Sequence, residues 1–462
     1  MDEFKLWLYS WDMLKNIGIH IINIEKRALC VLLCMVALSC SAFAVSVKSS
    51  SEGEASGAGN SFDSVPMLEA YYDQSLDANE EFWEQCQISL VTIGKGSPLY
   101  SWFGHSAFLV EAPGYPALVY DYGTFSFDDD DFYKNFALGR LWYCCSVSYA
   151  TSELAYLEST GRTYNLVSLN LTAAQKKAII NFLSVNASTE HRTYLYNHYT
   201  DNCATRLRDI INYATGGDFQ AWATSQKGRT YRQLASSALS QNRLLQWVLE
   251  FLQSGQIDQD ATLWDEMFLP SILESALLQY GTKTGLINPD TSSVAVSDGA
   301  TNVASDVEPS SNLLFSVLTG LGLGFICFLL LWLSRSGRLT GLYKGYTFTV
   351  NLILGLLGTL LMFMMCFTNH NVTWYNENLL FVNPLLLVMA VLSLRRNGGK
   401  LLTCLYRVLL ALMAVLVVLK LVLPEVFLQD NWTVFAMLAP YYAVNAFGRL
   451  QRGTKAVATK SN

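Results

Sequence analysis

The sequence predicts two folded parts, an α+β domain followed by an all-α domain of five transmembrane helices. The 462-residue chain is longer than a single core of ordinary size requires, and 51% of its residues are hydrophobic. Up to about residue 284, β-branched and aromatic runs mix with amphipathic stretches without regular alternation, which favours α+β over a doubly wound sheet. Five apolar stretches follow residue 311.

The first 44 residues have the features of a signal peptide. Lys26 and Arg27 precede an apolar run over residues 28–38, and small residues follow up to Ala44. We therefore expect export of the next domain, with cleavage after Ala44. Met13 is an alternative start, and a retained signal anchor is the competing interpretation.

Two segments without apolar periodicity bound the exported domain. Residues 45–65 and 285–311 are rich in small and polar residues, which is typical of flexible linkers. The domain between them, residues 66–284, has expected strands at 87–93, 106–111, 117–122 and 164–170. Helices are expected from a capping box of Thr172 and Gln175, and from Asn202 towards Tyr213.

The membrane domain is expected over residues 312–448. Its apolar stretches are residues 313–333, 346–367, 379–394, 401–423 and 432–447. Most approach the ~20 residues that a bilayer requires, although the third and fifth are short. Lys and Arg follow the first, third and fifth stretches and are absent from residues 370–378 and 424–431. The positive-inside rule then predicts an outward N-terminal domain and a cytoplasmic tail at residues 449–462.

Cys203 has the most reactive setting among the cysteines expected outside the membrane. The others in this domain are Cys86, Cys144 and Cys145. Asn202 is a good N-cap, so the Cys203 thiol falls in the first turn of a helix, where the dipole and free N–H groups stabilise a thiolate. A disulfide to one of the other three cysteines is the competing interpretation.

His105 is the candidate base for this thiol. It begins an apolar strand just after Gly104, a place from which a side chain can project into a cleft. A His strand that precedes a Cys helix resembles the permuted papain-like (NlpC-type) fold. Asp121 or Tyr122 is expected to orient the imidazole if the two strands are neighbours. Asn202 has two interpretations, an oxyanion donor or a helix cap only.

A polar loop is expected at the outer membrane boundary. It contains His370, Thr373, Asn376, Asn378 and Asn383, and these side chains are predicted to contact substrate. Asn383 falls inside an apolar stretch, where an amide is costly unless it has a partner such as a lipid headgroup or another helix. The competing interpretation is an ordinary hydrated loop with an aromatic belt.

Charge and motif patterns exclude several functions. The formal net charge is −7 and Lys and Arg do not cluster, which argues against nucleic acid as a partner. The sequence has no zinc-binding pattern, phosphate loop or dinucleotide fingerprint. No metal and no cofactor are therefore expected.

The motifs resemble those of the Lnb-type lipoprotein N-acyltransferases of bacteria. The resemblance rests on the polar outward loop with its five apolar stretches and on four motifs, WFGHSAF (102–108), YGTFSF (122–127), DNCATRLRD (201–209) and WDEMFLP (264–270). It implies a periplasmic catalytic domain on the bacterial inner membrane, with Cys203 and His105 as the catalytic pair. It also implies transfer of an acyl chain from a phospholipid to the α-amino group of a diacylglyceryl-cysteine lipoprotein, through a Cys thioester.

Two alternatives remain open at this point. The same Cys–His pair would serve a membrane-tethered cysteine peptidase or amidase that acts on the cell wall. A non-enzymatic envelope receptor or assembly factor, with Cys203 in a disulfide, is the second. Five membrane stretches and a polar outward loop are more than a tether requires, which favours a lipid substrate.

Overall fold

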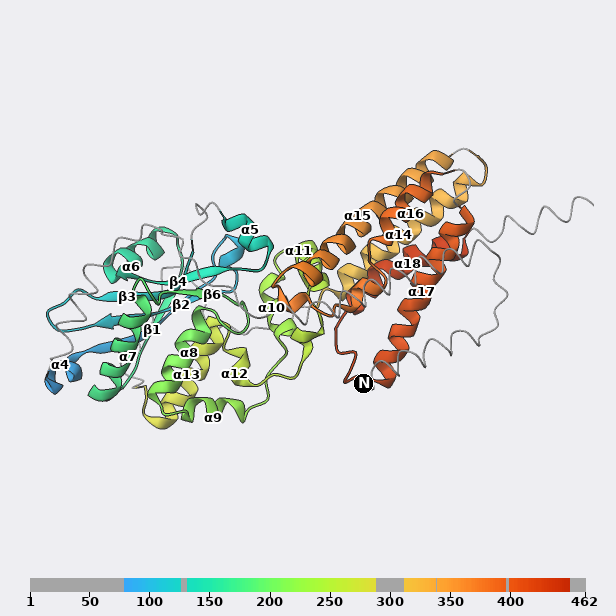
Figure 1. Cartoon of the computed structure of the whole chain (residues 1–462). Helices are drawn as coiled ribbons and strands as arrows, with labels where there is room; N and C mark the ends of the chain where they lie inside the picture. The colour runs from blue at the N-terminus through green and yellow to red at the C-terminus, as the bar shows by residue number, and fades with distance from the viewer. Residues whose placement is uncertain (1–78, 126–130, 288–310, 338, 396–398, 449–462) are drawn as a thin grey trace, which may run out of the picture.

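The computed structural model describes residues 79–125, 131–287, 311–337, 339–395 and 399–448. They form an α+β domain and a helical domain that lie end to end (Figure 1). The expected signal peptide, first linker and cytoplasmic tail lie outside the described residues, as does most of the linker expected at residues 285–311.

The α+β domain is built on one six-stranded antiparallel sheet with the strand order β5-β1-β2-β3-β4-β6. The strands are β1 (Gln87–Ile93), β2 (His105–Glu111), β3 (Leu118–Thr124), β4 (Trp142–Tyr149), β5 (Tyr164–Ser168) and β6 (Thr193–Leu195). The four expected strands correspond to β1, β2, β3 and β5. Strands β4 and β6 were not expected from the sequence, and they complete the sheet beside β3.

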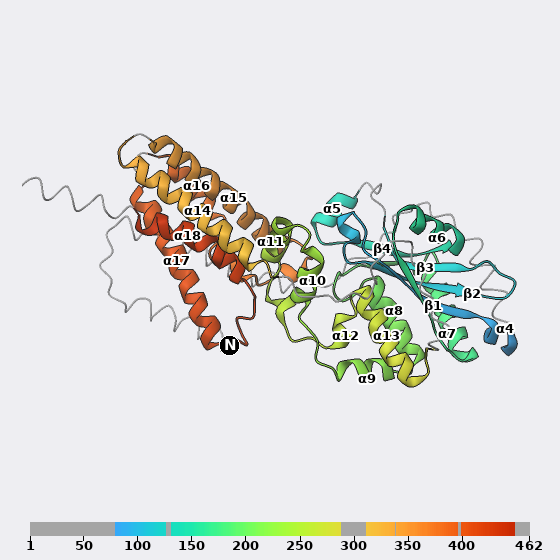
Figure 2. The same cartoon turned by 180° about the vertical axis from the view of Figure 1, so that it is seen from behind.

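Helices cover both faces of this sheet and extend towards the second domain (Figure 2). They are α4 (Glu80–Gln85), α5 (Phe132–Ala137), α6 (Ala150–Ser159), α7 (Ala173–Ala187), α8 (Cys203–Ala214), α9 (Asp218–Thr224), α10 (Tyr231–Leu239), α11 (Arg243–Leu252), α12 (Leu263–Glu266) and α13 (Pro270–Thr284), with short 3-10 turns η2 (Leu99–Ser101) and η3 (Gly255–Asp258). The capping box that begins α7 is present, because the side chains of Thr172 and Gln175 each accept the other residue's backbone N–H.

The alternation of side chains along the strands divides the core into two layers. Leu90, Phe108 and Tyr120 point to the face covered by α7, α8 and α13. Val91 and Ala107 point to the opposite face, which α6 covers. Strand β2 lies in the middle of the sheet. Its first residue, His105, therefore lies at the end of a central strand, next to both layers of the core.

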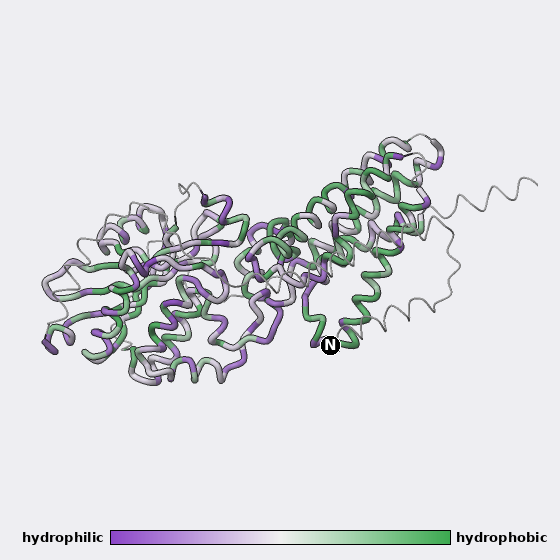
Figure 3. Tube along the Cα trace, in the orientation of Figure 1, coloured by the Kyte–Doolittle hydropathy of each residue, from purple (hydrophilic) through white to green (hydrophobic). Residues whose placement is uncertain are grey.

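The helical domain contains the five expected apolar stretches as α14 (Leu313–Ser334), α15 (Thr340–Phe367), α16 (Leu385–Leu394), α17 (Gly399–Val422) and α18 (Trp432–Phe447). Within the described residues, four helical segments are long and apolar enough to cross a membrane: α14, α15, α17 and the segment Glu377–Leu394, which joins the turn η5 (Glu377–Leu380) to α16. Helix α18 has only 16 residues and packs against α14 and α17. Hydrophobic residues follow these helices along their length (Figure 3).

Buried amides join the two domains. Asn376 and Asn378, in the connector between α15 and α16, both donate from Nδ2 to the carbonyl oxygen of Phe251 at the end of α11, at 3.0 and 2.9 Å. Gln429, in the connector between α17 and α18, donates to the carbonyl of Gln253 at 3.1 Å. Each bond satisfies a carbonyl that the end of a helix leaves without an intrahelical partner.

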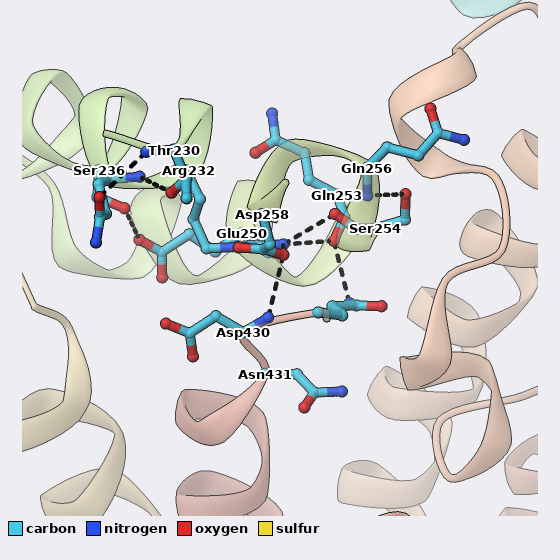
Figure 4. Close-up of polar contacts among 12 residues, drawn as sticks. Thr230, Arg232, Ser236, Glu250, Gln253, Ser254, Gln256, Asp258, Asp430 and Asn431 are labelled. Atoms are coloured by element: carbon cyan, nitrogen blue, oxygen red, sulfur yellow. Dashed lines mark hydrogen bonds and ion pairs between the residues drawn. The ribbon is translucent and has the colours of Figure 1, made fainter. Parts of the chain in front are cut away.

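A buried ion pair strengthens the same interface (Figure 4). Arg232 binds Asp258 with 2.6 Å between Nε and Oδ1, and both side chains are almost fully buried. The second oxygen of Asp258 accepts the backbone N–H of Asp430 at 3.1 Å. On the membrane side, Lys420 lies 2.5 Å from Glu377. The hydrogen bonds that cross between the domains, those of Asn376, Asn378, Gln429 and Asp430, are defined as the interdomain clamp.

Glycine allows a second close approach between the domains. Gly139 follows α5 with a φ of +73°, and a β-carbon there would lie 2.6 Å from the backbone nitrogen of His370. The backbone N–H of Asn369 donates to the carbonyl of Leu138 at 2.7 Å. The α+β domain therefore sits against the connectors that lack Lys and Arg, which agrees with the outward orientation predicted for it.

Candidate active site

Cys203 is the first residue of α8, as the sequence predicts. The N-cap Asn202 accepts the backbone N–H of Thr205 at 2.9 Å, and Thr205 accepts the N–H of Asn202 at 2.7 Å. The amide of Asn202 donates to the carbonyls of His198 and Phe268 at 2.8 and 2.9 Å. Both amide hydrogens are therefore engaged, so the structure supports the capping interpretation of Asn202 and not the oxyanion interpretation.

His105 is the first residue of β2 and bonds to Asp121 on the neighbouring strand β3. The Nε2 atom of His105 lies 2.7 Å from Oδ1 of Asp121, and the two side chains are 21% and 24% exposed. Of the two candidates to orient the imidazole, the structure thus places Asp121 beside it. Tyr122 points to the other face of β3, where it is buried next to Tyr194 with ring centroids 6.3 Å apart.

The thiol of Cys203 lies beside the imidazole of His105. It is close enough to this ring and to the backbone N–H of Ser106 for both groups to lower its pKa. Cys203 and His105 are 98 positions apart in the sequence, but their elements, α8 and β2, pack directly on each other. The structure therefore brings Cys203, His105 and Asp121 together in one row.

The charges in this row oppose the effect of burial. Burial by itself raises the pKa of Cys203, but the positive charge and hydrogen bond of His105 and the N–H of Ser106 bring that pKa below its usual value. Burial lowers the pKa of His105, but the charges of Asp121 and Cys203 and their hydrogen bonds raise it well above its usual value. These directions favour a thiolate–imidazolium pair near neutral pH.

The carboxylate of Asp121 is held in its charged form. Burial raises its pKa, but the charge and hydrogen bond of His105 lower it, and so does the backbone N–H of Gly123, which donates to Oδ1 at 2.6 Å. The net direction is a lowered pKa. Asp121 is thus an acceptor that can orient the imidazole and stabilise its protonated form.

Two glycines make room for the histidine, and only one of them was singled out from the sequence. Gly104 has a φ of +79°, and a β-carbon there would lie 3.0 Å from the carbonyl oxygen of Ile93. Gly123 was not identified as a site residue. A β-carbon at Gly123 would overlap Cε1 of His105 and lie 3.1 Å from Oδ1 of Asp121. Its place in the YGTFSF motif was the available signal.

Tyrosines from β4 and from the segment that includes β6 surround the thiol on one side. After burial, the negative charge of Cys203 is the next largest cause that raises the pKa values of Tyr143, Tyr194 and Tyr196. The rings of Tyr143 and Tyr196 stack with centroids 4.2 Å apart. These tyrosines were not predicted as site residues, because β4 and β6 were not predicted as strands.

His198 packs among aromatic rings near the start of α8. Its ring centroid lies 4.4 Å from that of Phe103 and 5.6 Å from that of Phe268. Burial lowers the pKa of His198 to about 4, so the ring is neutral at physiological pH. These ring contacts indicate a packing role for His198.

The other cysteines of this domain differ from Cys203 in electrostatic setting. Cys86, Cys144, Cys145 and Cys203 are all free thiols in the structure, so the competing disulfide interpretation of Cys203 has no support there. Burial raises the pKa of Cys86, Cys144 and Cys145. Among these four thiols, only that of Cys203 has a lowered pKa.

Two residues predicted to contact substrate belong instead to the interdomain clamp. Asn376 and Asn378 are buried, and their amide nitrogens bond to the carbonyl of Phe251. Their oxygens are also engaged: Asn376 accepts from the N–H of Asn378 and from Gln429, and Asn378 accepts from Asn431. Because their hydrogen-bonding atoms already have protein partners, a substrate contact at these two residues has no support in the structure.

The remaining predicted loop residues also bond within the protein. Thr373 is buried and its hydroxyl donates to the carbonyl of His370 at 2.8 Å. The Nε2 atom of His370 lies 3.1 Å from the carbonyl oxygen of Phe136 in α5. The amide of Asn383 accepts the N–H of Leu385, the first residue of α16, and donates to the carbonyl of Leu379. These contacts give the loop a structural role. The structure shows no group of three or more metal-binding side chains among the described residues.

Models of known protein families match both domains. A model of the Lnb N-terminal periplasmic domain matches residues 74–237, a span that contains His105, Asp121 and Cys203. A model of the Lnb transmembrane domain matches residues 313–448. No curated protein and no solved structure matches the chain.

Proposed function

Because the chain belongs to the Lnb family, and so has a periplasmic N-terminal domain and transmembrane helices, we propose that it is a lipoprotein N-acyltransferase of the bacterial inner membrane. Its acyl donor is a phospholipid, and its acceptor is the α-amino group of a diacylglyceryl-cysteine lipoprotein. The observation that carries the proposal is the row formed by Cys203, His105 and Asp121, with a lowered thiol pKa. The resemblance to a permuted papain-like fold supports the same chemistry.

In the first half-reaction, the thiolate of Cys203 attacks the carbonyl carbon of the phospholipid ester. The ester C–O bond breaks, the acyl group stays on sulfur as a thioester, and the leaving alkoxide takes a proton from the imidazolium of His105. Lysophospholipid departs. Asp121 stabilises the imidazolium before this transfer and keeps the ring in its orientation afterwards.

In the second half-reaction, the amine of the lipoprotein attacks the thioester carbon. The C–S bond breaks, an amide forms, and the neutral imidazole of His105 takes the proton that the amine nitrogen loses. The thiolate and the imidazolium are restored. The backbone N–H groups of Cys203 and Ala204, at the start of α8, are the donors we assign to the oxyanion in both half-reactions.

The position of the row relative to the membrane domain supports lipid substrates. The connectors that bind the α+β domain are the outward ends of the membrane helices, and contacts of Phe251, Gln253 and Asp258 fix the two domains against each other. Both proposed substrates are anchored in the bilayer and cannot diffuse to a distant soluble site. A fixed attachment to the bilayer surface therefore brings the thiol within their reach.

The test is mass spectrometry of the N-terminus of a model lipoprotein, expressed with this protein in cells that lack their own N-acyltransferase. We expect an added acyl chain with the wild-type protein and with Cys86→Ser, and a free amine with Cys203→Ser and His105→Ala. Cys86 is the matched control because it is a buried free thiol with a raised pKa.

A free amine with the wild-type protein contradicts the proposed activity. If wall fragments are cleaved in the same cells and Cys203→Ser stops that cleavage, the cysteine peptidase or amidase alternative replaces it. An acylated lipoprotein in cells that express Cys203→Ser would show that another group carries the acyl chain.

A further inference from the structure

We propose that five aromatic rings form a path along which the acyl chain of the donor lipid passes from the bilayer surface to Cys203. The aromatic path consists of Tyr196, Tyr143, Phe125, Phe132 and Phe136. The inference rests on the proposed function, since it assigns a binding site for the donor's acyl chain. It concerns binding only and adds no chemical step.

The inner end of the path lies at the thiol. Tyr143 on β4 is paired with Tyr194 on β6, and the guanidinium carbon of Arg206, one turn after Cys203 on α8, lies 3.8 Å from the centroid of Tyr194. The hydroxyl of Tyr196 lies 3.4 Å from Nδ1 of His198, and the carbonyl of His198 accepts the amide of Asn202, the neighbour of Cys203. The centroids of Tyr143 and Tyr196 are 4.2 Å apart with an interplanar angle of 20°, and burial and the negative charge of Cys203 raise the pKa values of both hydroxyls. An acyl chain on the sulfur therefore has these rings beside it.

The middle of the path is a series of ring contacts that connects β4 to α5. Phe125 follows β3, and its centroid lies 4.8 Å from that of Tyr143 and 6.0 Å from that of Phe132. Phe132 and Phe136 are four residues apart on α5 and stack with centroids 6.1 Å apart. Each ring thus contacts the next.

The outer end of the path lies against the membrane domain. The carbonyl of Phe136 accepts a hydrogen bond from His370, and Gly139, just beyond α5, lies against the backbone of Asn369 and His370. In both overall views α5 is at the end of the sheet that is nearest the membrane helices (Figures 1 and 2). The exposed ring of Phe367, at the end of α15, comes three residues before His370.

The exposure of the rings indicates an occupant. None of the five is fully buried, Phe136 is 54% exposed, and its neighbour Tyr133 is 72% exposed. Rings that only filled a core would be covered, whereas exposed apolar rings at a membrane–water boundary are typical of surfaces that contact lipid. The path begins at this boundary and ends at the acyl-accepting sulfur. Because the path is continuous with the outward loop of the membrane domain, the occupant we assign to it is a lipid acyl chain.

The first test uses photo-crosslinking, which does not depend on turnover. Full-length Cys203→Ala protein is placed in phosphatidylethanolamine vesicles that contain a lipid with a diazirine near the end of one acyl chain. After illumination and digestion, we expect labelled peptides that include Phe132, Phe136 and Tyr143, in addition to peptides of the membrane helices. Labels confined to α14–α18 overturn the proposal.

The second test compares two donors. Phe132→Ser/Phe136→Ser is expected to slow formation of the Cys203 acyl-enzyme from vesicle phospholipid by about tenfold, since truncation of aromatic rings that a bound ligand covers costs roughly that factor. A soluble short-chain ester donor, which bypasses the outer part of the path, should react at the wild-type rate and so reports correct folding. Tyr213→Ser is the matched control, because that ring is 69% exposed at the far end of α8. Phe132→Leu/Phe136→Leu should retain activity with both donors.

The outcomes separate the two proposals. Equal rates for the Ser variant and wild type with the vesicle donor overturn the path, and so does an equal loss with both donors, since that indicates a structural defect. A wild-type protein that forms no acyl-enzyme with either donor contradicts the proposed function, while the crosslinking pattern still decides whether lipid chains bind along the rings.

Discussion

Gly123 lies directly against the imidazole of His105, where a β-carbon would overlap the Cε1 atom of the ring. The missing side chain thus fixes where the imidazole can sit between Asp121 and Cys203. We expect Gly123→Ala to displace the ring and to lower the rate of acyl-enzyme formation by about 100-fold, the loss typical of a misplacement near 1 Å. The protein should remain folded, because the clash is with one partly exposed side chain at the end of β2.

The control for this prediction is Gly322→Ala in α14, where a β-carbon has no heavy atom within 4 Å. It should leave the rate at the wild-type level. A Gly123→Ala protein that is as active as wild type would show that the imidazole has an alternative position that the reaction tolerates.

Asp121→Asn should make the rate of acyl-enzyme formation fall at a lower alkaline pH than in the wild-type protein. The charge of Asp121 raises the pKa of His105, so its removal lowers that pKa, and the imidazolium then loses its proton at a lower pH. The alkaline limb of the rate of acyl-enzyme formation should therefore move to lower pH. A pH profile whose alkaline limb is the same in both proteins would mean that Asp121 does not set the protonation of His105.

Iodoacetamide should distinguish Cys203 from the other thiols of its domain. At pH 7 we expect rapid alkylation of Cys203 and slow alkylation of Cys86, Cys144 and Cys145, since only the first has a lowered pKa and burial raises the others. His105→Ala removes the positive charge, so it should slow the labelling of Cys203. Peptide mapping by mass spectrometry gives the four rates. Unreactive Cys203 in the wild-type protein would contradict both enzymatic interpretations.

Arg232→Ala should destabilise the full-length protein. It leaves Asp258 buried without its cation, which typically costs about 3–5 kcal/mol. The measurement is thermal unfolding in detergent micelles. Lys134→Ala is the matched control, because Lys134 and Asp131 form an exposed ion pair, for which about 0–1 kcal/mol is typical. Equal midpoints for the two variants would show that the buried pair contributes no more than a surface pair.

The strands that the sequence predicted are those with dense apolar character. β1 and β2 are buried over almost every position, and their residues are strongly β-forming. β4 is half-buried along its length without a two-residue period, so hydrophobic alternation was not available to identify it. β6 has three residues and depends on pairing with β4. Both missed strands are therefore products of tertiary pairing.

The candidate site was predictable where local sequence determines geometry. The helix start at Cys203 follows from a capping residue, and the pairing of His105 with Asp121 follows from two neighbouring strands. The role of Asn376 was not predictable, because its partner is the carbonyl of Phe251, 125 positions earlier in the chain. A polar loop residue that faces lipid and one that bonds to a distant carbonyl have the same sequence pattern.

The interdomain clamp determines how far the Cys203 sulfur lies from the membrane surface. Asn376, Gln429 and Asp430 hold the α+β domain by direct bonds, so the chain between α13 and α14 does not set its position. The height of the Cys203 sulfur above the lipid headgroups is then a fixed dimension of the molecule. Under the proposed function, a lipoprotein can present its N-terminal amine to Cys203 only if the first residues after its anchored cysteine bridge that height. Acceptors whose N-terminal peptide cannot extend that far would then not be acylated.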